Sequence, residues 1–265
     1  MNIRNMLLKL HWLLSAQFGI DFRKMLLSLR GIPRYLRDLF CFRSNYSGRL
    51  ALLPCLNDWY EEGGTTKSEY FWQDLLVARL IFDAKPEKHA DIGSRVDGFV
   101  AHVASFREIE VFDIRPITSK IPGVVFKQVD LIKPIGEIAG KGCYDSLSCL
   151  HALEHFGLGR YGDPIDVKGF ERGFINMTGL LKKNGVFYLS VPIGVDRVEF
   201  NANRVFNPRV IIDLAVKNSL RLSALMVIRQ GGKVETIVPD EMQLFDLASQ
   251  HYALGIFTFV KYAEV

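Results

Sequence analysis

The feature that most constrains this chain is an alternation of short β-rich runs with other segments, beginning near residue 88. Five runs come in succession, KHADIG, EIEVFD, GVVFKQVD, YDSLSCL and GVFYLSVP, and helical or loop stretches fit between most of them. Two further strand candidates, LRLSALMVIR and GIFTFVKYA, follow. This alternation is typical of a parallel sheet with helices on both faces. We therefore predict an α/β fold for this part of the chain.

The N-terminal part has a different character. Residues 1–50 hold nine Lys and Arg against two Asp, a net charge of +7, although the whole chain carries only +4. Residues 1–40 have helical spacing of apolar side chains such as Phe22, Leu26 and Leu29, with a break expected at Gly-Ile-Pro 31–33. A turn-rich stretch follows. We predict a basic helical arm and linker over residues 1–66 and one domain over residues 67–265.

Two roles fit this arm. It is either an amphipathic extension packed on the main domain, or a basic surface that contacts an anionic membrane or an anionic glycan carrier. The chain has no stretch of about 18 uncharged apolar residues, so we expect no membrane span. We expect a cytoplasmic protein, which in the second case contacts the inner face of the membrane or glycan-assembly proteins through its arm.

Acidic residues stand where three successive predicted strands end. Asp91 and Gly93 lie in the DIG turn after the first, Asp113 ends the second, and Asp130 ends the third. In open α/β sheets, ligands bind beyond the carboxyl ends of the strands. A carboxylate after the second strand suits the ribose hydroxyls of an adenosine-type ligand, and one after the third suits the adenine amino group.

The fourth predicted strand, YDSLSCL, leads into His151, Glu154 and His155. Histidine has an ordinary pKa near neutrality and can act as a general base toward a hydroxyl. We take His155 or His151 as the base and Glu154 as the group that orients it. The other interpretation is a packed histidine beside a solvated glutamate. We expect no metal, since no clean third ligand is present.

Two polar segments are candidates for substrate binding. GLGRYGDPID is too rich in glycine and proline for a helix, so we place its Arg160, Tyr161 and Asp163 on a loop that covers the strand ends. The segment after the fifth strand suits hydroxyl-rich or anionic ligands, and a hairpin with an Arg–Glu199 ion pair is the competing interpretation. Its candidate residues are Arg197, Glu199, Asn201, Asn203 and Arg204.

Taken together, residues 88–262 resemble the class I S-adenosylmethionine-dependent methyltransferases. The resemblance lies in the D-x-G turn, Asp113, Asp130, the LEH at 153–155 and GLLKKNGVFYLSVP. It implies a Rossmann-like sandwich with a seven-stranded, mostly parallel sheet whose last strand is antiparallel, preceded by the helical extension. It also implies S-adenosylmethionine as cofactor, bound by Asp91, Gly93, Ser94, Arg95, Asp113, Ile114, Asp130 and Leu131.

The glycine pattern departs from that family. Arg95 and Asp97 stand at the positions of its second and third glycines. Arg95 is therefore a candidate to pair with the cofactor carboxylate, because a guanidinium fits a carboxylate bidentately.

Longer strings, EYFWQDL, DIGSRVDGFVAHV, SLSCLHALEHFGLGRYGDPID and YLSVPIGVDRVEFNANRVF, resemble a bacterial domain family of unknown function. That family is methyltransferase-like and often associated with surface-polysaccharide genes. The resemblance implies O-methylation of a sugar or glycan precursor. The alternative is a non-catalytic cofactor-binding or scaffolding protein of a polysaccharide assembly system, which the altered glycines favour. We expect no nucleic acid as partner, since the main domain is mildly acidic.

Overall fold

The computed structural model describes residues 3–134 and 141–262 and divides the chain into two compact units, residues 1–65 and 66–265. The N-terminal unit holds α1 (Ile3–Phe18), α2 (Phe22–Asn45) and a 3-10 turn, Asp58–Tyr60. Asp21 caps α2 by accepting hydrogen bonds from the main-chain N–H groups of Arg23 and Lys24. The break expected at residues 31–33 is absent, since α2 continues through Gly31 and Pro33. No described helix is long and apolar enough to cross a membrane.

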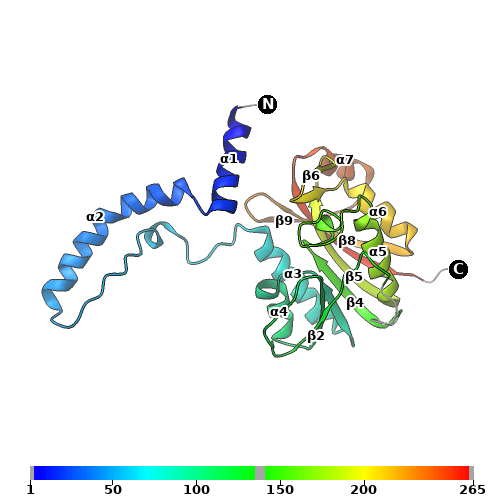
Figure 1. Ribbon diagram of the computed structural model, residues 1–265. Helices are drawn as coiled ribbons and strands as arrows, with labels where there is room; N and C mark the ends of the chain where they lie inside the picture. Colours follow the sequence, from blue (N-terminus) through cyan, green and yellow to red (C-terminus); the bar gives the residue numbers. More distant parts are fainter. Residues whose placement is uncertain (1–2, 135–140, 263–265) are drawn as a thin grey trace. The chain divides into compact units, whose positions relative to one another are not determined.

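The second unit is built on a sheet of eight described strands in the order β3-β2-β1-β4-β5-β10-β8-β9. Figure 1 shows strands of this unit with helices beside them. The strands are β1 (His89–Ile92), β2 (Ile109–Asp113), β3 (Val124–Gln128), β4 (Tyr144–Leu150), β5 (Leu181–Ile193), β8 (Leu220–Arg229), β9 (Lys233–Ile237) and β10 (Ala253–Lys261). β1 to β5 are parallel, and β10 runs antiparallel to both β5 and β8. The prediction of a mostly parallel sheet with an antiparallel last strand is confirmed.

The predicted number of strands in the sheet, seven, was too low by one, because β9 adds an eighth strand. β9 returns antiparallel along β8. The turn between them contains Gly231 and Gly232, both with positive φ, which is the backbone that a tight hairpin turn requires. A short separate hairpin pairs β6 (Arg197–Glu199) with β7 (Asn203–Val205).

Helices cover both faces of the sheet. Val77, Ile81 and Phe99, from α3 (Glu69–Ala84) and the turn before α4 (Ala101–Ala104), pack on one face. Phe174 and Ile211, from α5 (Gly169–Leu180) and α6 (Pro208–Lys217), pack on the other together with α7 (Glu241–Ser249). The sheet is thus buried on both sides, and the polar carboxyl ends of β1 to β4 are left to form a site.

A buried carboxylate shapes the first of these strand ends. Asp91, in β1, is fully buried and accepts hydrogen bonds from Ser94 N, Ser94 Oγ and Ser148 Oγ. Burial raises the pKa of Asp91 to about 7, which the serine hydrogen bonds partly oppose. Ser94 Oγ also accepts a hydrogen bond from Leu150 N, so this cluster ties β1 to β4.

Gly93 completes the same turn with φ +70°, and a Cβ there would lie 3.0 Å from Ala152 Cβ. We predict that Gly93→Ala lowers the free energy of unfolding by about 2 kcal/mol, because an L side chain is strained at this φ. Urea denaturation followed by circular dichroism measures the change. The matched control is Gly179→Ala in α5, where an added Cβ meets nothing within 4 Å. The control is expected to be neutral or mildly stabilising, and equal losses in both variants would contradict this account of the turn.

Candidate active site

A cavity of about 510 Å³ lies at the carboxyl ends of β1 to β4. Most of the residues expected to hold a cofactor line it, namely Gly93, Ser94, Arg95, Asp113, Ile114, Asp130 and Leu131. Apolar side chains from the same strand ends, Ile92, Phe112 and Val129, complete this part of the wall. Asp91 lies beneath the Gly93 turn and does not line the cavity, so it supports the wall from behind.

The expected role of Arg95 does not fit its contacts. Arg95 is exposed and forms a bidentate ion pair with Asp97, through Nε at 3.0 Å and Nη2 at 2.7 Å. Its guanidinium is therefore already paired with an acid of the same turn. Asp130 accepts a hydrogen bond from Ile132 N at 3.0 Å, and Lys133 Nζ lies 3.5 Å from its other oxygen.

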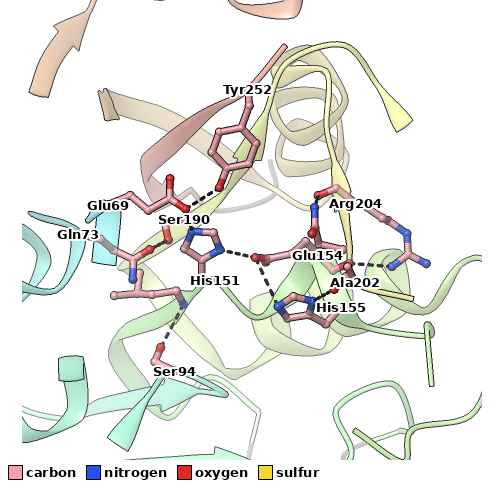
Figure 2. A network of polar contacts seen from close by, with 12 residues as sticks. Glu69, Gln73, Ser94, His151, Glu154, His155, Ser190, Ala202, Arg204 and Tyr252 are labelled. Carbon is pink, nitrogen blue, oxygen red and sulfur yellow. Dashed lines mark hydrogen bonds and ion pairs between the residues drawn. The ribbon is translucent and has the colours of Figure 1, made fainter. Parts of the chain in front are cut away.

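His151 stands immediately after β4 with a left-handed backbone, φ +52°, and its buried ring lies between two carboxylates (Figure 2). Its Nδ1 is 2.6 Å from Glu154 Oε1, and its Nε2 is 3.2 Å from Glu69 Oε1. A carboxylate only accepts hydrogen bonds, so Nδ1 carries a proton that it donates to Glu154, whereas Nε2 lies at ion-pair distance from Glu69 and has no hydrogen-bond partner among the described residues. Burial acts to lower the pKa of His151, but the charges of Glu154 and Glu69 raise it to about 9. A cation with no free electron pair is not the base.

His155 is in the opposite state. Its Nδ1 donates to the main-chain carbonyl of Ala202 at 2.7 Å, which leaves Nε2 with the lone pair of the neutral ring. Burial lowers the pKa of His155 below its usual value, and the nearby Glu154 carboxylate opposes this shift. Nε2 lies 3.7 Å from Glu154 Oε1, beyond hydrogen-bond distance, and the ring lines the cavity. Of the two histidines, His155 has the geometry of a general base.

Glu154 and its neighbours are fixed by a wider network (Figure 2). The segment 153–155 is a 3-10 turn, not the regular helix that would place His151 and His155 on one face. Glu154 is fully buried, and its Oε2 has no hydrogen-bond partner among the described residues. Beyond His151, the chain of contacts continues to Glu69 at the start of α3 and to the hydroxyl of Tyr252, which donates to Glu69 at 2.7 Å.

The two segments expected to bind substrate have different positions. Arg160, Tyr161 and Asp163 line the cavity, and the Asp163 carboxylate holds its loop by accepting from the N–H groups of Gly157, Gly159 and Tyr161. The candidates in the second segment do not line it. Arg197 pairs with Glu199 at 2.9 Å, as the hairpin interpretation held. Asn203 bonds to the carbonyl of Arg204, and Asn201 lies in the exposed turn of the same hairpin.

Arg204 is buried and works as an internal clamp. Its guanidinium donates to the carbonyls of Glu154 and Phe156 at 3.2 and 2.6 Å. It therefore fixes the turn that carries His155, and it is not free for a ligand.

Sequence reasoning missed Arg115, Glu69, Tyr70 and Tyr252. Arg115 forms a bidentate ion pair with Asp113, and Tyr70 stacks on His151 with ring centroids 4.7 Å apart. Glu69 follows the N-cap Ser68 in the first turn of α3, where an acid commonly stabilises a helix. Its position therefore gave no indication of a role in the site. Arg115 stands two residues after Asp113, and an oppositely charged neighbour so close was a usable signal.

The fold is similar to solved structures of the class I methyltransferase type. One is 1,6-didemethyltoxoflavin-N1-methyltransferase from Burkholderia thailandensis, solved with 1,6-didemethyltoxoflavin and S-adenosylhomocysteine. It is 13% identical, with a TM-score of 0.52 over 78% of this chain and 82% of that one. Another is the [4+2]-cyclase SpnF, 10% identical, with a TM-score of 0.51 over 72% of this chain and 81% of that one. The chain thus has the Rossmann-like methyltransferase fold, and a cyclase among its neighbours shows that this fold does not fix the reaction.

Sequence comparison adds one match. A family model described as "Caenorhabditis protein of unknown function, DUF268" matches residues 120–217, which is less than half of the chain. Neither a bacterial origin nor a link to polysaccharides follows from that description. No curated protein matches the sequence.

We predict that the two histidines titrate on opposite sides of neutrality. The pKa of His151 is higher in the folded than in the unfolded chain, so its stabilising effect is complete below about pH 6.5 and is lost as pH rises through about 9. The free energy of unfolding should fall over this interval by up to about 3 kcal/mol. Denaturant titrations at several pH values measure it.

The matched variants are His151→Asn, because asparagine tolerates a left-handed backbone, and His251→Gln at an exposed position. Most of the fall between these pH values should be absent in the first and all of it should persist in the second, while a smaller part due to Asp91, with its pKa of about 7, remains in both. A wild-type stability that is flat across the interval would exclude a charged His151.

Proposed function

We propose that this protein is an S-adenosylmethionine-dependent methyltransferase that acts on a hydroxyl group. The observation that carries the proposal is the cavity at the strand ends, which has the Gly93 turn and Asp113 at one part of its wall and the neutral His155 at another. Its volume of about 510 Å³ is within the range of small-molecule sites. It can therefore hold a small-molecule ligand.

The residues present fit such a cofactor. The missing Cβ of Gly93 lets a ligand approach the main chain closely. The apolar side chains Phe112, Ile114 and Leu131 suit a flat purine, and the carboxylates of Asp113 and Asp130 suit ribose hydroxyls and an adenine amino group. When bound, S-adenosylmethionine supplies an electrophilic methyl group.

The chain's own residues supply positioning and a proton acceptor. His155 Nε2 takes the proton of the acceptor hydroxyl, and the Glu154 carboxylate at 3.7 Å stabilises the imidazolium that results. His151 offsets the charge of Glu154 and Glu69, and Arg204 fixes the turn. The polar rim of Arg160, Tyr161 and Asp163 favours a hydroxyl-rich acceptor, so a sugar or glycan precursor is the acceptor we propose. Its place in surface-polysaccharide biosynthesis rests on the sequence resemblance.

We predict that the wild-type chain binds S-adenosylmethionine and S-adenosylhomocysteine. Asp113→Asn should bind both about tenfold or more weakly, because hydrogen bonds to a charged acceptor are lost. Isothermal titration calorimetry measures the affinities. Glu199→Gln, which lies outside the cavity, is the control and should bind normally. Absence of binding by the wild type would sink the proposal.

Turnover separates the enzyme from the non-catalytic alternative. Transfer of labelled methyl groups to a panel of nucleotide sugars should occur with the wild type and be lost in His155→Gln, whose cofactor affinity should be unchanged. Cofactor binding without transfer by the wild type would favour a cofactor-binding or scaffolding protein.

We also propose that the N-terminal unit lies at an anionic membrane surface, which would place the protein at the inner face of the membrane. α2 exposes apolar side chains along one stripe, Phe22, Met25, Leu26, Leu29, Leu36 and Phe40. Another face of α2 carries Ser28 and Gly31, which contact Asn57 and Leu56. Within this unit the stripe is therefore left uncovered, and basic residues such as Arg23 and Arg30 flank it.

We expect the full chain to sediment with vesicles that contain phosphatidylserine, and more weakly in high salt. Leu26→Glu combined with Phe40→Glu should abolish sedimentation. Met242→Glu, at an exposed apolar residue of α7, should leave it intact. Equal binding to pure phosphatidylcholine, or no binding, would rule this proposal out. Loss of solubility or a change in oligomeric state on adding the double substitution would show instead that the stripe is covered by protein.

A further inference from the structure

The carboxylate best placed for a ribose is already engaged by a neighbour. Asp113 Oδ1 accepts hydrogen bonds from Arg115 N at 2.8 Å and Arg115 Nε at 3.0 Å, and Oδ2 accepts from Arg115 Nη2 at 2.6 Å. The same Nη2 lies 3.4 Å from the carbonyl of Gly93. Arg115 thus closes over the corner of the cavity between the ends of β1 and β2.

Counting acceptor sites shows that Arg115 and a ribose compete. An ionised carboxylate offers about four acceptor sites, two on each oxygen. Arg115 uses both sites of Oδ1 and one of Oδ2. A ribose diol that donates one hydrogen bond to each oxygen finds Oδ1 saturated. Asp113 is also only 8% exposed beneath the guanidinium, so a ribose reaches it only when the Arg115 side chain moves.

The same guanidinium touches the loop over the cavity. It lies 4.5 Å from the centre of the Tyr161 ring, and Tyr161 packs edge-on against His155 at 5.5 Å. Arg160 lies 5.1 Å from the same ring. Movement of Arg115 away from Asp113 therefore changes a contact of the loop that also contacts the proposed base.

We infer that Arg115 is an affinity-determining residue that competes with the ribose of the nucleoside ligand for Asp113. This inference rests on the proposed function, since it concerns the same cavity and ligand. Arg115 is 42% exposed at its side chain, so it has room to swing into solvent when the ribose displaces it. When no ligand is present, the Arg115 guanidinium pairs with the Asp113 carboxylate. When a ligand displaces Arg115, its contact with the Tyr161 ring changes as well, so ligand binding also affects Tyr161.

Calorimetry with adenosine and S-adenosylhomocysteine tests this inference, which expects a gain of affinity when a side chain is removed. Arg115→Met removes the guanidinium and keeps an unbranched side chain. Both ligands should bind this variant about tenfold more tightly than the wild type, because the charged hydrogen bonds of Arg115 no longer compete with them. Arg115→Lys keeps the charge without the bidentate geometry and should give a smaller gain. Arg172→Met, at an exposed arginine paired with Asp166, is the matched control and should bind like the wild type.

Unchanged or weaker binding by Arg115→Met, with Arg115→Lys also showing no gain, would overturn the inference while leaving the proposed function in place. Failure of the wild type and of every variant to bind either ligand would overturn both. Tighter binding by Arg115→Met than by the wild type, with a smaller gain in Arg115→Lys, would support the inference.

A second readout is independent of affinity. In nuclear magnetic resonance spectra, the Nε–H signal of Arg115, assigned by its loss in Arg115→Met, should shift when the wild type is saturated with adenosine. The Nε–H signal of Arg172 should not move. A stationary Arg115 signal at saturation would contradict displacement.

Discussion

The buried carboxylate of Asp91 is the constraint on which the arrangement of the site depends. It holds Ser94 and Ser148, and Ser94 in turn accepts a hydrogen bond from the N–H of Leu150. Through these contacts one acid joins the Gly93 turn after β1 to the last residue of β4. His151 follows that residue directly, so the part of the cavity suited to a nucleoside and the part that carries the histidines are set relative to each other by a hydrogen-bonded cluster inside the sheet.

Charge is distributed unevenly around the cavity. At the end of β2, Asp113 and Arg115 neutralise each other. At the end of β4, His151 is shared by Glu69 and Glu154, which leaves an excess of negative charge close to His155. One histidine is thereby used to hold carboxylates in place, and the other remains neutral beside them. Two side chains of the same type thus acquire different roles from their surroundings alone.

Much of the fold could be read from the sequence, because buried parallel strands are continuous apolar runs that end at polar turns. All seven predicted strands are present, as β1 to β5, β8 and β10. β9 was missed because its residues alternate between polar and apolar and so form no continuous apolar run. The Gly-Gly turn before it, which is a hairpin signal, was not used. At the site, most residues next to strand ends were found, since local order places them there, although Arg115, two residues after the end of β2, was missed. Glu69 and Tyr252 were not found, because they come from segments far away in the chain, where Glu69 contacts His151 and Tyr252 contacts Glu69, and no local pattern marks such contacts.

The hairpin of β8 and β9 also affects how the sheet meets other molecules. Without β9, the outer strand would be β8, ten residues long with a free row of main-chain donors and acceptors. β9 replaces it with an edge of only five residues, on which Lys233 and Glu235 form an ion pair at 2.6 Å. Short, charged edges resist the addition of a foreign strand. The hairpin therefore disfavours pairing of the sheet edge with a strand of another molecule. This protection against aggregation is separate from any chemistry in the cavity.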